Sequence, residues 1–225
     1  MRPVDRRFPT YTAAEAAADR MIHLLGVPAA VAAVSWLITS VGPTASVTLT
    51  ITLLIYGFGL IGMLAASAAY NVSRPGRGKE LLRRADHAMI FVMIAGSYTP
   101  FALNALAQHG GRRLCVVVWL LAGFGVALKL ALPRRFERLS LLLYLGMGWS
   151  VLAMFNSFLA SVQRDVFALL LLGGVAYSLG AAIHSLRRLP FHNPVWHALV
   201  LVGAGLHLAA ISLQFATPSW AAACR

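Results

Sequence analysis

The sequence predicts an all-α membrane protein, a seven-helix transmembrane bundle with a cytoplasmic N-terminus and an extracytoplasmic C-terminus. Three observations carry this prediction: the composition, seven long apolar stretches, and basic residues that fall in alternate loops. Only 12% of the 225 residues are charged and 59% are hydrophobic, whereas a soluble domain carries about 25% charged residues. Such a chain cannot cover a water-facing surface, so the composition indicates an integral membrane protein.

Seven stretches are long enough to cross a bilayer, which takes about 20 apolar residues per helix. They cover residues 21–41, 45–70, 84–106, 114–132, 139–160, 165–184 and 194–215. Short connections leave no room for a soluble domain. We therefore expect a cytoplasmic segment over 1–20, the transmembrane domain over 21–215 and a short extracytoplasmic tail over 216–225. The first segment is too charged, and the apolar run after it too long, for a cleaved signal peptide.

Basic residues set the orientation, because cytoplasmic loops of membrane proteins are enriched in Lys and Arg. Fifteen of the 19 fall in the N-terminal segment and in the second, fourth and sixth connections, and only Arg112, Arg113, Arg164 and Arg225 fall on the other side. The net charge of +12 then reflects cytoplasmic loops and anionic head groups. Membrane lipids are the expected partners and nucleic acid is not, while self-association stays open. A retinal protein is excluded, since the seventh span contains no lysine for a Schiff base.

Polar side chains gather at the predicted cytoplasmic ends of four spans. In chain order they are Asp19, His23, Ser67, Asn71, Asp86, His87, His192, Asn193 and His197. Ser67 and Asn71 share a helix face at i, i+4, as do Asn193 and His197. Imidazole, carboxylate, amide and hydroxyl groups at one depth favour a metal or hydrolytic site over scattered interfacial anchoring.

Structural interpretations of some of these residues stay open. Asn193 before Pro194 is typical of an N-cap followed by proline at the first helical position. His192 precedes that cap and need not face the same way. His207 lies about 15 Å deeper than His197 and about 80° around the helix. We therefore expect His207 to form hydrogen bonds within the bundle rather than to join the same site.

Four segments of the chain carry a resemblance to a known family. ADRMIHLLG (18–26), SAAYN (67–71), LLRRADHAMIFVMIAGSYTPF (81–101) and NPVWHALVLVGAGLH (193–207) resemble motifs of the hemolysin III family. This family is the bacterial branch of the progestin and adipoQ receptor family and is similar to alkaline ceramidases. The resemblance covers nearly the full length and implies a multi-pass protein of the bacterial inner membrane.

The resemblance also implies a zinc site near the inner leaflet. In such families one His of a Ser-x-x-x-His motif on helix two and two of a His-x-x-x-His motif on helix seven hold zinc. An Asp at the start of helix three approaches the metal-bound water. Ser67, Asp86 and His197 match the Ser, the Asp and the second helix-seven His.

Three positions depart from the family pattern. Asn71 and Asn193 stand where two zinc-binding histidines are expected, and Asp19 stands where the first helix has Asn. An amide oxygen is a poor zinc ligand, so these residues better suit a hydrogen-bonded cluster or a weak hard-cation site. Zinc binding is recovered if His192 replaces Asn193, or if His23 or His87 turns inward.

The residues and the resemblance together favour a metal-dependent hydrolase of a lipid amide or ester. His197, with His23 or His192, would hold the metal, while Asp86 acts as general base and Ser67 supports the oxyanion. The alternative is a non-catalytic protein of membrane homeostasis that senses a lipid in the same pocket. Pore formation is the least favoured function, because no span shows the polar stripe of a water-filled channel.

The orientation can be tested with topology reporters. A reporter that is active only outside the cytoplasm should work when fused after Arg225, because the fifteen-to-four distribution of basic residues places that end outside. The same reporter should stay silent when inserted at 74–80. Activity at the second position and silence at the first would contradict the orientation.

Overall fold

The computed structural model describes residues 11–43, 45–132 and 134–216, and this part of the chain is helical almost throughout. The helices are α1 (Ala13–Ser40), α2 (Val47–Val72), α3 (Arg77–Pro100), α4 (Gly111–Ala131), α5 (Glu137–Gly148), α6 (Phe155–Ser161), α7 (Arg164–Ser185) and α8 (His192–Phe215). A π-helical turn, η1 (Phe101–Ala105), extends α3, and a 3-10 turn, η2 (Ser150–Met154), joins α5 to α6.

Seven helices of the described residues are long and apolar enough to cross a membrane, counting α3 with η1 and α5 with η2 and α6. The predicted number of spans is confirmed, although the first and third helices begin earlier than expected, at Ala13 and Arg77.

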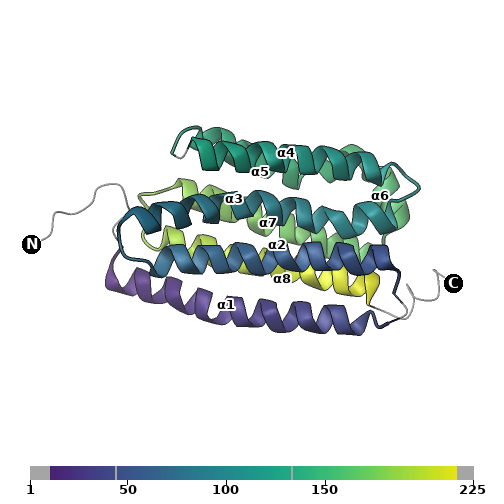
Figure 1. Ribbon diagram of the computed structural model, residues 1–225, viewed down its shortest axis with the longest axis horizontal. Coiled ribbons are helices and arrows are strands. Elements are labelled where there is room, and N and C mark those ends of the chain that lie inside the picture. Colours follow the sequence, from purple (N-terminus) through teal and green to yellow (C-terminus); the bar gives the residue numbers. More distant parts are fainter. Residues whose placement is uncertain (1–10, 44, 133, 217–225) are drawn as a thin grey trace, which may run out of the picture.

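The helices run side by side along the long axis of the molecule (Figure 1). Helix α1 packs on α2 and α8, α2 packs on α3, α3 packs on α4, and α7 packs on α8. Since the number of crossings is odd, α1 begins and α8 ends at opposite ends of the bundle. We call the end where α1, α3 and α8 begin the site end.

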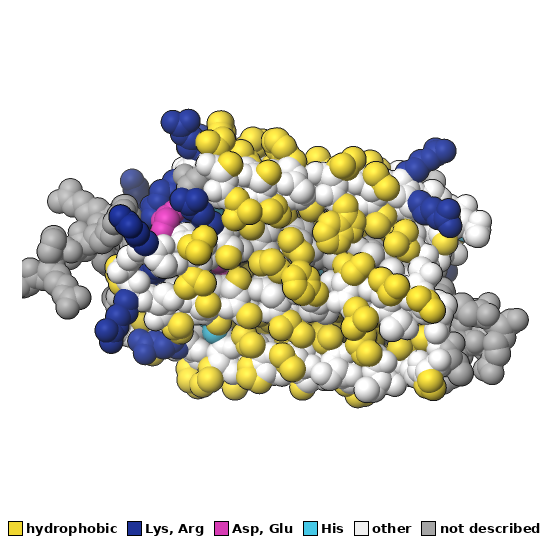
Figure 2. All heavy atoms as spheres, viewed as in Figure 1, with side chains coloured by type: hydrophobic (Ala, Val, Ile, Leu, Met, Phe, Trp, Pro, Cys, Tyr) yellow, Lys and Arg dark blue, Asp and Glu magenta, His cyan; other side chains and the backbone are white. Residues whose placement is uncertain are grey.

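Large apolar side chains cover the long sides of the bundle (Figure 2). Leu24, Phe58, Leu120 and Leu142 are each about two-thirds exposed. A belt of this kind would be a large exposed apolar patch on a soluble protein, but it matches the hydrocarbon core of a bilayer. Basic side chains stand at the two ends of the same view, mainly at the site end.

The fifth span is broken, which the apolar run over 139–160 did not predict. Helix α5 ends at Gly148, and the chain continues through η2 into α6. The Tyr98 hydroxyl donates to the Gly148 carbonyl (2.7 Å) and accepts from the Val151 amide (3.1 Å). A bilayer offers no water to satisfy freed backbone groups, so this tyrosine of α3 stabilises the break.

The first turns of α1 and α8 are joined through one carboxylate. Thr12 and Glu15 form a capping box at the start of α1, and Glu15 also accepts a hydrogen bond from the Phe191 amide (2.8 Å). Phe191 is the N-cap of α8, which begins at His192. The expected N-cap at Asn193 is therefore wrong. Glu15 accepts the hydrogen bond of the Phe191 amide at the start of α8. The Asn193 side chain contacts Asp19 instead of capping the helix.

Ion pairs hold the start of α3 against α4 and α5. Lys129 of α4 is 2% exposed and donates to Glu137 of α5 (3.0 Å). Arg83 of α3 lies 3.6 Å from the same carboxylate and pairs with Glu80 at 3.0 Å. A buried cation needs such partners, and together these pairs fix the turn of α3 that carries Asp86.

Small residues allow the helices to approach closely, as is common in membranes. A Cβ atom on Gly59 of α2 would lie 3.2 Å from the Met93 Cα, and one on Gly96 of α3 would lie 3.3 Å from the Ile55 carbonyl oxygen. A Cβ atom on Gly111, the first residue of α4, would collide with the Ala102 carbonyl and lie 2.7 Å from the Leu106 Cβ. Backbone atoms cannot move aside as a flexible side chain can.

Gly111→Ala should therefore destabilise the protein by about 1–3 kcal/mol, the usual cost of overpacking. Gly123→Ala on the same helix is the matched control, since its Cβ atom would meet nothing within 4 Å and alanine favours the helix. Thermal unfolding of the detergent-purified proteins measures both effects. Equal midpoints for the two variants would contradict this packing of α4 on η1.

Candidate metal centre

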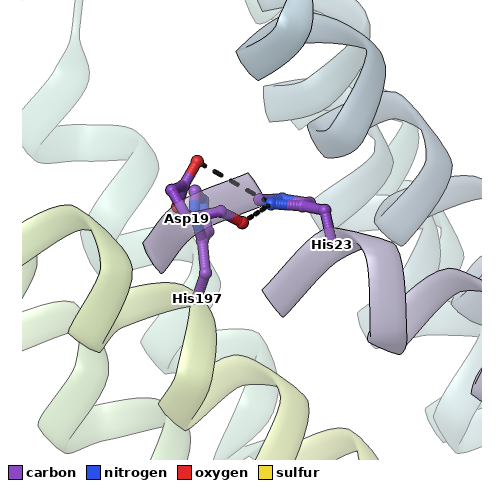
Figure 3. A group of neighbouring side chains, drawn as sticks. All are labelled: Asp19, His23 and His197. Carbon is purple, nitrogen blue, oxygen red and sulfur yellow. Dashed lines mark hydrogen bonds and ion pairs between the residues drawn. The ribbon is translucent and has the colours of Figure 1, made fainter. Parts of the chain in front are cut away.

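Asp19 and His23 of α1 and His197 of α8 converge at the site end of the bundle (Figure 3). Each offers one ligand atom, and these atoms all lie within 4.8 Å of one another. Asp19 and His23 are i, i+4 on one helix face and are 5% and 6% exposed. The His23 and His197 rings meet edge to face, with centroids 4.7 Å apart. Two imidazoles and a carboxylate thus share one buried site.

Hydrogen-bond partners determine which ring nitrogens carry protons. His197 Nδ1 lies 2.5 Å from Asp19 Oδ1, and His23 Nδ1 lies 2.8 Å from the Asp19 main-chain carbonyl oxygen. An ionised carboxylate and a carbonyl only accept hydrogen bonds, so both Nδ1 atoms donate. In the neutral rings both Nε2 atoms then carry lone pairs.

Both lone pairs face the Ser67 hydroxyl of α2. Ser67 Oγ lies 3.1 Å from His23 Nε2 and 3.4 Å from His197 Nε2. A hydroxyl has one proton and can donate to only one of them. The second lone pair is left without a donor in a buried place, which is costly. The second lone pair can therefore accept a metal ion.

The residues present fit a divalent metal. Imidazole and carboxylate side chains are the usual protein ligands of catalytic zinc. The contact from the Asp19 carboxylate to His197 Nδ1 is of the kind that orients a zinc-binding histidine and raises its basicity. The Asp19–His23–His197 group, which we call the metal centre, could hold such an ion.

Ser67, Asn71 and Asp86 lie around the metal centre. Asn71 Nδ2 donates to the Ser67 carbonyl (3.0 Å) and lies 3.5 Å from Ser67 Oγ. The Asp86 carboxylate interacts with the Ser67 side chain and electrostatically with His197. Asp86 Oδ2 is also 3.4 Å from His87 Nδ1. Helices α2 and α3 thus bring the two predicted catalytic side chains to the metal centre.

Asn193 also contacts the metal centre, because its Nδ2 lies 3.4 Å from Asp19 Oδ1. Both asparagines at expected ligand positions thus contact neighbours of the imidazoles, Asn71 at Ser67 and Asn193 at Asp19. Of the three histidines expected to recover zinc binding, His23 turns toward His197. The other two are directed elsewhere.

His87, His192 and His207 are held by main-chain carbonyls outside the metal centre. His87 Nδ1 lies 2.8 Å from the Arg83 carbonyl oxygen, and His192 Nδ1 lies 3.0 Å from that of Leu189. The His192 ring stands beside Tyr11, at 6.1 Å between centroids. His207 Nε2 lies 3.3 Å from the Leu170 carbonyl oxygen, which confirms the expected hydrogen bond within the bundle.

The sequence analysis counted Asp19 among the polar residues of the pocket but not among the metal ligands, whereas the structure puts it beside both imidazoles. One Asp19 oxygen contacts both His197 and Asn193, and its main-chain carbonyl holds His23. The signal for this role was present, since Asp19 and His23 are spaced i, i+4 at the start of the first span. The contact to α8 depends on tertiary packing and has no local signal.

A pocket of about 230 Å³ lies beside the metal centre and reaches Asp19. Its polar lining includes Tyr11, Glu15, Asp19, Asn71 and Asn193. Burial raises the pKa of Tyr11, and the nearby Tyr70, Asp19 and Glu15 raise it further. The Tyr11 hydroxyl therefore stays protonated and is available as a hydrogen-bond donor at the pocket.

Comparison with known proteins assigns the family. The family described as Haemolysin-III related matches residues 14–208, a range that contains all three residues of the metal centre. The chain belongs to this family. The resemblance of the four sequence motifs is thereby confirmed.

Relatives in bacteria and mammals are similar over most of the chain. A hemolysin-3 homolog of Bacillus subtilis (strain 168) is 34% identical, with 86% of this chain and 91% of the relative covered. Hemolysin-3 of Bacillus cereus is 30% identical, with 85% and 88% covered. The human monocyte to macrophage differentiation factor is 28% identical, with 72% and 69% covered. No solved structure matches the chain.

The two imidazole lone pairs of the metal centre give a test by metal binding. Zinc added to the metal-stripped, detergent-purified protein should raise its unfolding midpoint, since a ligand at 100 times its Kd stabilises by about 2.7 kcal/mol. His23→Ala and His197→Ala should each abolish this rise. His192→Ala should keep it, because His192 lies outside the metal centre. A rise that survives both substitutions, or none in the wild type, would contradict a metal centre here.

Proposed function

We propose that the protein is a zinc-dependent hydrolase of the bacterial plasma membrane that cleaves an amide or ester bond of a membrane lipid. The observation that carries this proposal is the convergence of two imidazole lone pairs and a carboxylate beside Ser67 and Asp86. Buried ionisable groups in a membrane-spanning bundle are costly and mark functional sites.

The proposed orientation puts the metal centre near the inner leaflet. Support comes from the basic side chains of the described residues, of which the site end carries twelve and the opposite end only Arg112, Arg113 and Arg164. Positive charge collects on the cytoplasmic side of membrane proteins. The pocket beside the metal centre would then open at the inner-leaflet boundary, where lipid amide and ester bonds lie.

Each residue at the site has a definable task in hydrolysis. His23 and His197 would hold zinc through their Nε2 atoms, with the Asp19 carboxylate beside them, and the ion would polarise a carbonyl and make bound water more acidic. Asp86 would accept the proton of the attacking water and return it to the leaving amine or alcohol. The Ser67 hydroxyl would donate to the oxygen on which negative charge develops. Asp19 would keep His197 in the tautomer whose Nε2 faces the site.

A second candidate is a lipid-sensing protein that binds its ligand in the same pocket without cleaving it. The observation that favours it is that Asn71 and Asn193 line this pocket, so amide groups able to hold a polar head group stand where imidazoles were expected. The name of the Bacillus cereus relative, hemolysin-3, does not lead us to propose lysis for this chain. The polar side chains of the metal centre lie close together, near the starts of α1 and α8, and do not form a stripe along the bundle.

The hydrolase is tested with the zinc-loaded, full-length protein in mixed micelles. Release of the acyl chain from a fluorescent N-acyl amide lipid, and from the matching ester, measures the reaction. Asp86→Asn should lower the rate at least about 100-fold, the usual size of a general-base contribution. Its zinc content should be unchanged, because Asp86 is not part of the metal centre. His192→Ala is the matched control and should keep the wild-type rate.

The outcomes separate the two candidates. Cleavage that depends on Asp86 at constant zinc content supports the hydrolase. Zinc binding and saturable lipid binding without cleavage of either substrate would rule out the hydrolase and support the sensor. Equal rates for the wild type and Asp86→Asn would also reject the proposed mechanism.

A further inference from the structure

Two carboxylates tie the site-end turns of α3, α4 and α5 together. Arg134, in the loop between α4 and α5, donates to Glu80 of α3 (2.6 Å). Glu137, the first residue of α5, accepts from the buried Lys129 of α4 (3.0 Å) and lies 3.6 Å from Arg83 of α3. The loop between α4 and α5 is therefore held against the first turns of α3.

Basic side chains outnumber these two carboxylates at the joined turns. Eight stand on or beside them: Arg77, Lys79, Arg83, Arg84, Lys129, Arg134, Arg135 and Arg138. Figure 2 shows such side chains gathered at the site end. Arg77, Arg135 and Arg138 are exposed, and none of the three forms an ion pair within the ranges that the structure describes. We call these three residues the arginine patch.

Apolar side chains accompany the arginine patch. Phe136, which follows Arg135, is 52% exposed, and Leu139, which follows Arg138, is 40% exposed. Leu132 at the end of α4 is also 40% exposed. Basic and large apolar side chains next to one another are typical of surfaces that meet lipid head groups and the acyl chains beneath them. A surface in contact with water alone would gain nothing from the exposed ring.

The backbone of the loop keeps Phe136 in a costly conformation. Phe136 has φ 57° and Arg134 has φ 71°, a left-handed region that bulky residues rarely adopt. The ion pair with Glu80 holds Arg134 in place. The Phe136 ring contacts no other aromatic ring of the described residues and stays half exposed. Such strain is commonly retained at functional positions, which here indicates contact with a surface outside the protein.

We propose that the arginine patch and Phe136 bind the phosphate head group of an anionic phospholipid. The guanidinium groups donate charge-assisted hydrogen bonds to the phosphate oxygens, and the Phe136 ring contacts the acyl chains beside the head group. Charge selects an anionic lipid over a zwitterionic one, because Glu80 and Glu137 already bind basic side chains and leave the patch positive. An acidic protein segment would match this charge but not the exposed ring.

The lipid site is separate from the metal centre and independent of the proposed hydrolase. Its residues belong to α3, α5 and the loop before α5, whereas the metal centre belongs to α1 and α8. Its test needs neither zinc nor a cleavable substrate. Because Glu80 and Glu137 join the loop to α3 and α4, a lipid bound here should stabilise the folded bundle by mass action.

The test is thermal unfolding of the full-length, detergent-purified protein titrated with phosphatidylglycerol. The unfolding midpoint should rise saturably, and phosphatidylcholine with the same chains should need at least about tenfold more lipid for half of the rise. Arg135→Gln with Arg138→Gln should need at least about tenfold more phosphatidylglycerol than the wild type, since each basic residue contributes about fivefold at an anionic surface.

The opposite end of α4 offers the matched control. Arg112 and Arg113 are also neighbouring exposed arginines, and Arg112→Gln with Arg113→Gln should keep the wild-type dependence on phosphatidylglycerol. Without lipid, both double variants should unfold at the wild-type temperature or above, because none of the four side chains forms an ion pair among the described residues. Equal weakening by the two double variants would show diffuse attraction of charge and overturn the proposal.

Two further measurements separate a lipid from a free anion. Phe136→Asn keeps a residue that tolerates the left-handed conformation and removes the ring, so it should weaken phosphatidylglycerol at least about threefold, as expected for partial loss of an apolar contact. Inorganic phosphate at the same concentration should not reproduce the rise. A full rise with inorganic phosphate, equal half-saturating amounts of the two lipids, or no saturable rise with phosphatidylglycerol would each overturn the proposal.

Discussion

The Asp19 carboxylate is the interaction on which the candidate site depends. It joins the first span to the last, because it contacts His197 and Asn193 of α8 while its own carbonyl holds His23 of α1. The hydrogen bond between Glu15 and the Phe191 amide fixes the two helix starts that bring these groups together. Helices 1 and 8 are far apart in sequence, so the metal centre exists only when the bundle has closed. A buried carboxylate needs such partners, since an ionised group in a low-dielectric surrounding is otherwise very costly.

The seven spans could be predicted because hydrocarbon thickness and apolar run length are directly related. Features decided by contacts between helices could not. The break after Gly148 is stabilised by Tyr98 from α3, and the start of α8 is set by Glu15 from α1. Both partners are distant in sequence. Because of Tyr98 the fifth span is not the continuous helix that was expected, and because of Glu15 the start of α8 is not capped by Asn193.

The members of the site were foreseen better than its geometry. Ser67, Asp86 and His197 came from matching motifs, and His23 was one of three histidines that could have turned inward. Nothing in the local sequence separates His23 from His87 and His192, because each can meet a main-chain carbonyl nearby. Only the packing of α1 on α8 puts the His23 ring 4.7 Å from that of His197.

The three departures from the family pattern, at 19, 71 and 193, are physically connected. Amides stand at two positions where the resemblance implies imidazoles, and the carboxylate of Asp19 stands where it implies an amide on α1. The Asn193 amide lies 3.4 Å from this carboxylate. A site of two imidazoles and a carboxylate carries one negative charge, whereas three neutral imidazoles carry none. Around a divalent ion this reduces the net charge from two to one, and the cost of burying charge in a low-dielectric bundle falls steeply with its size. The negative charge of the carboxylate can therefore compensate for the imidazole that is absent at position 193 of α8. The Asn71 amide donates to the Ser67 carbonyl and lies beside the Ser67 hydroxyl, which faces the lone pairs of both imidazoles.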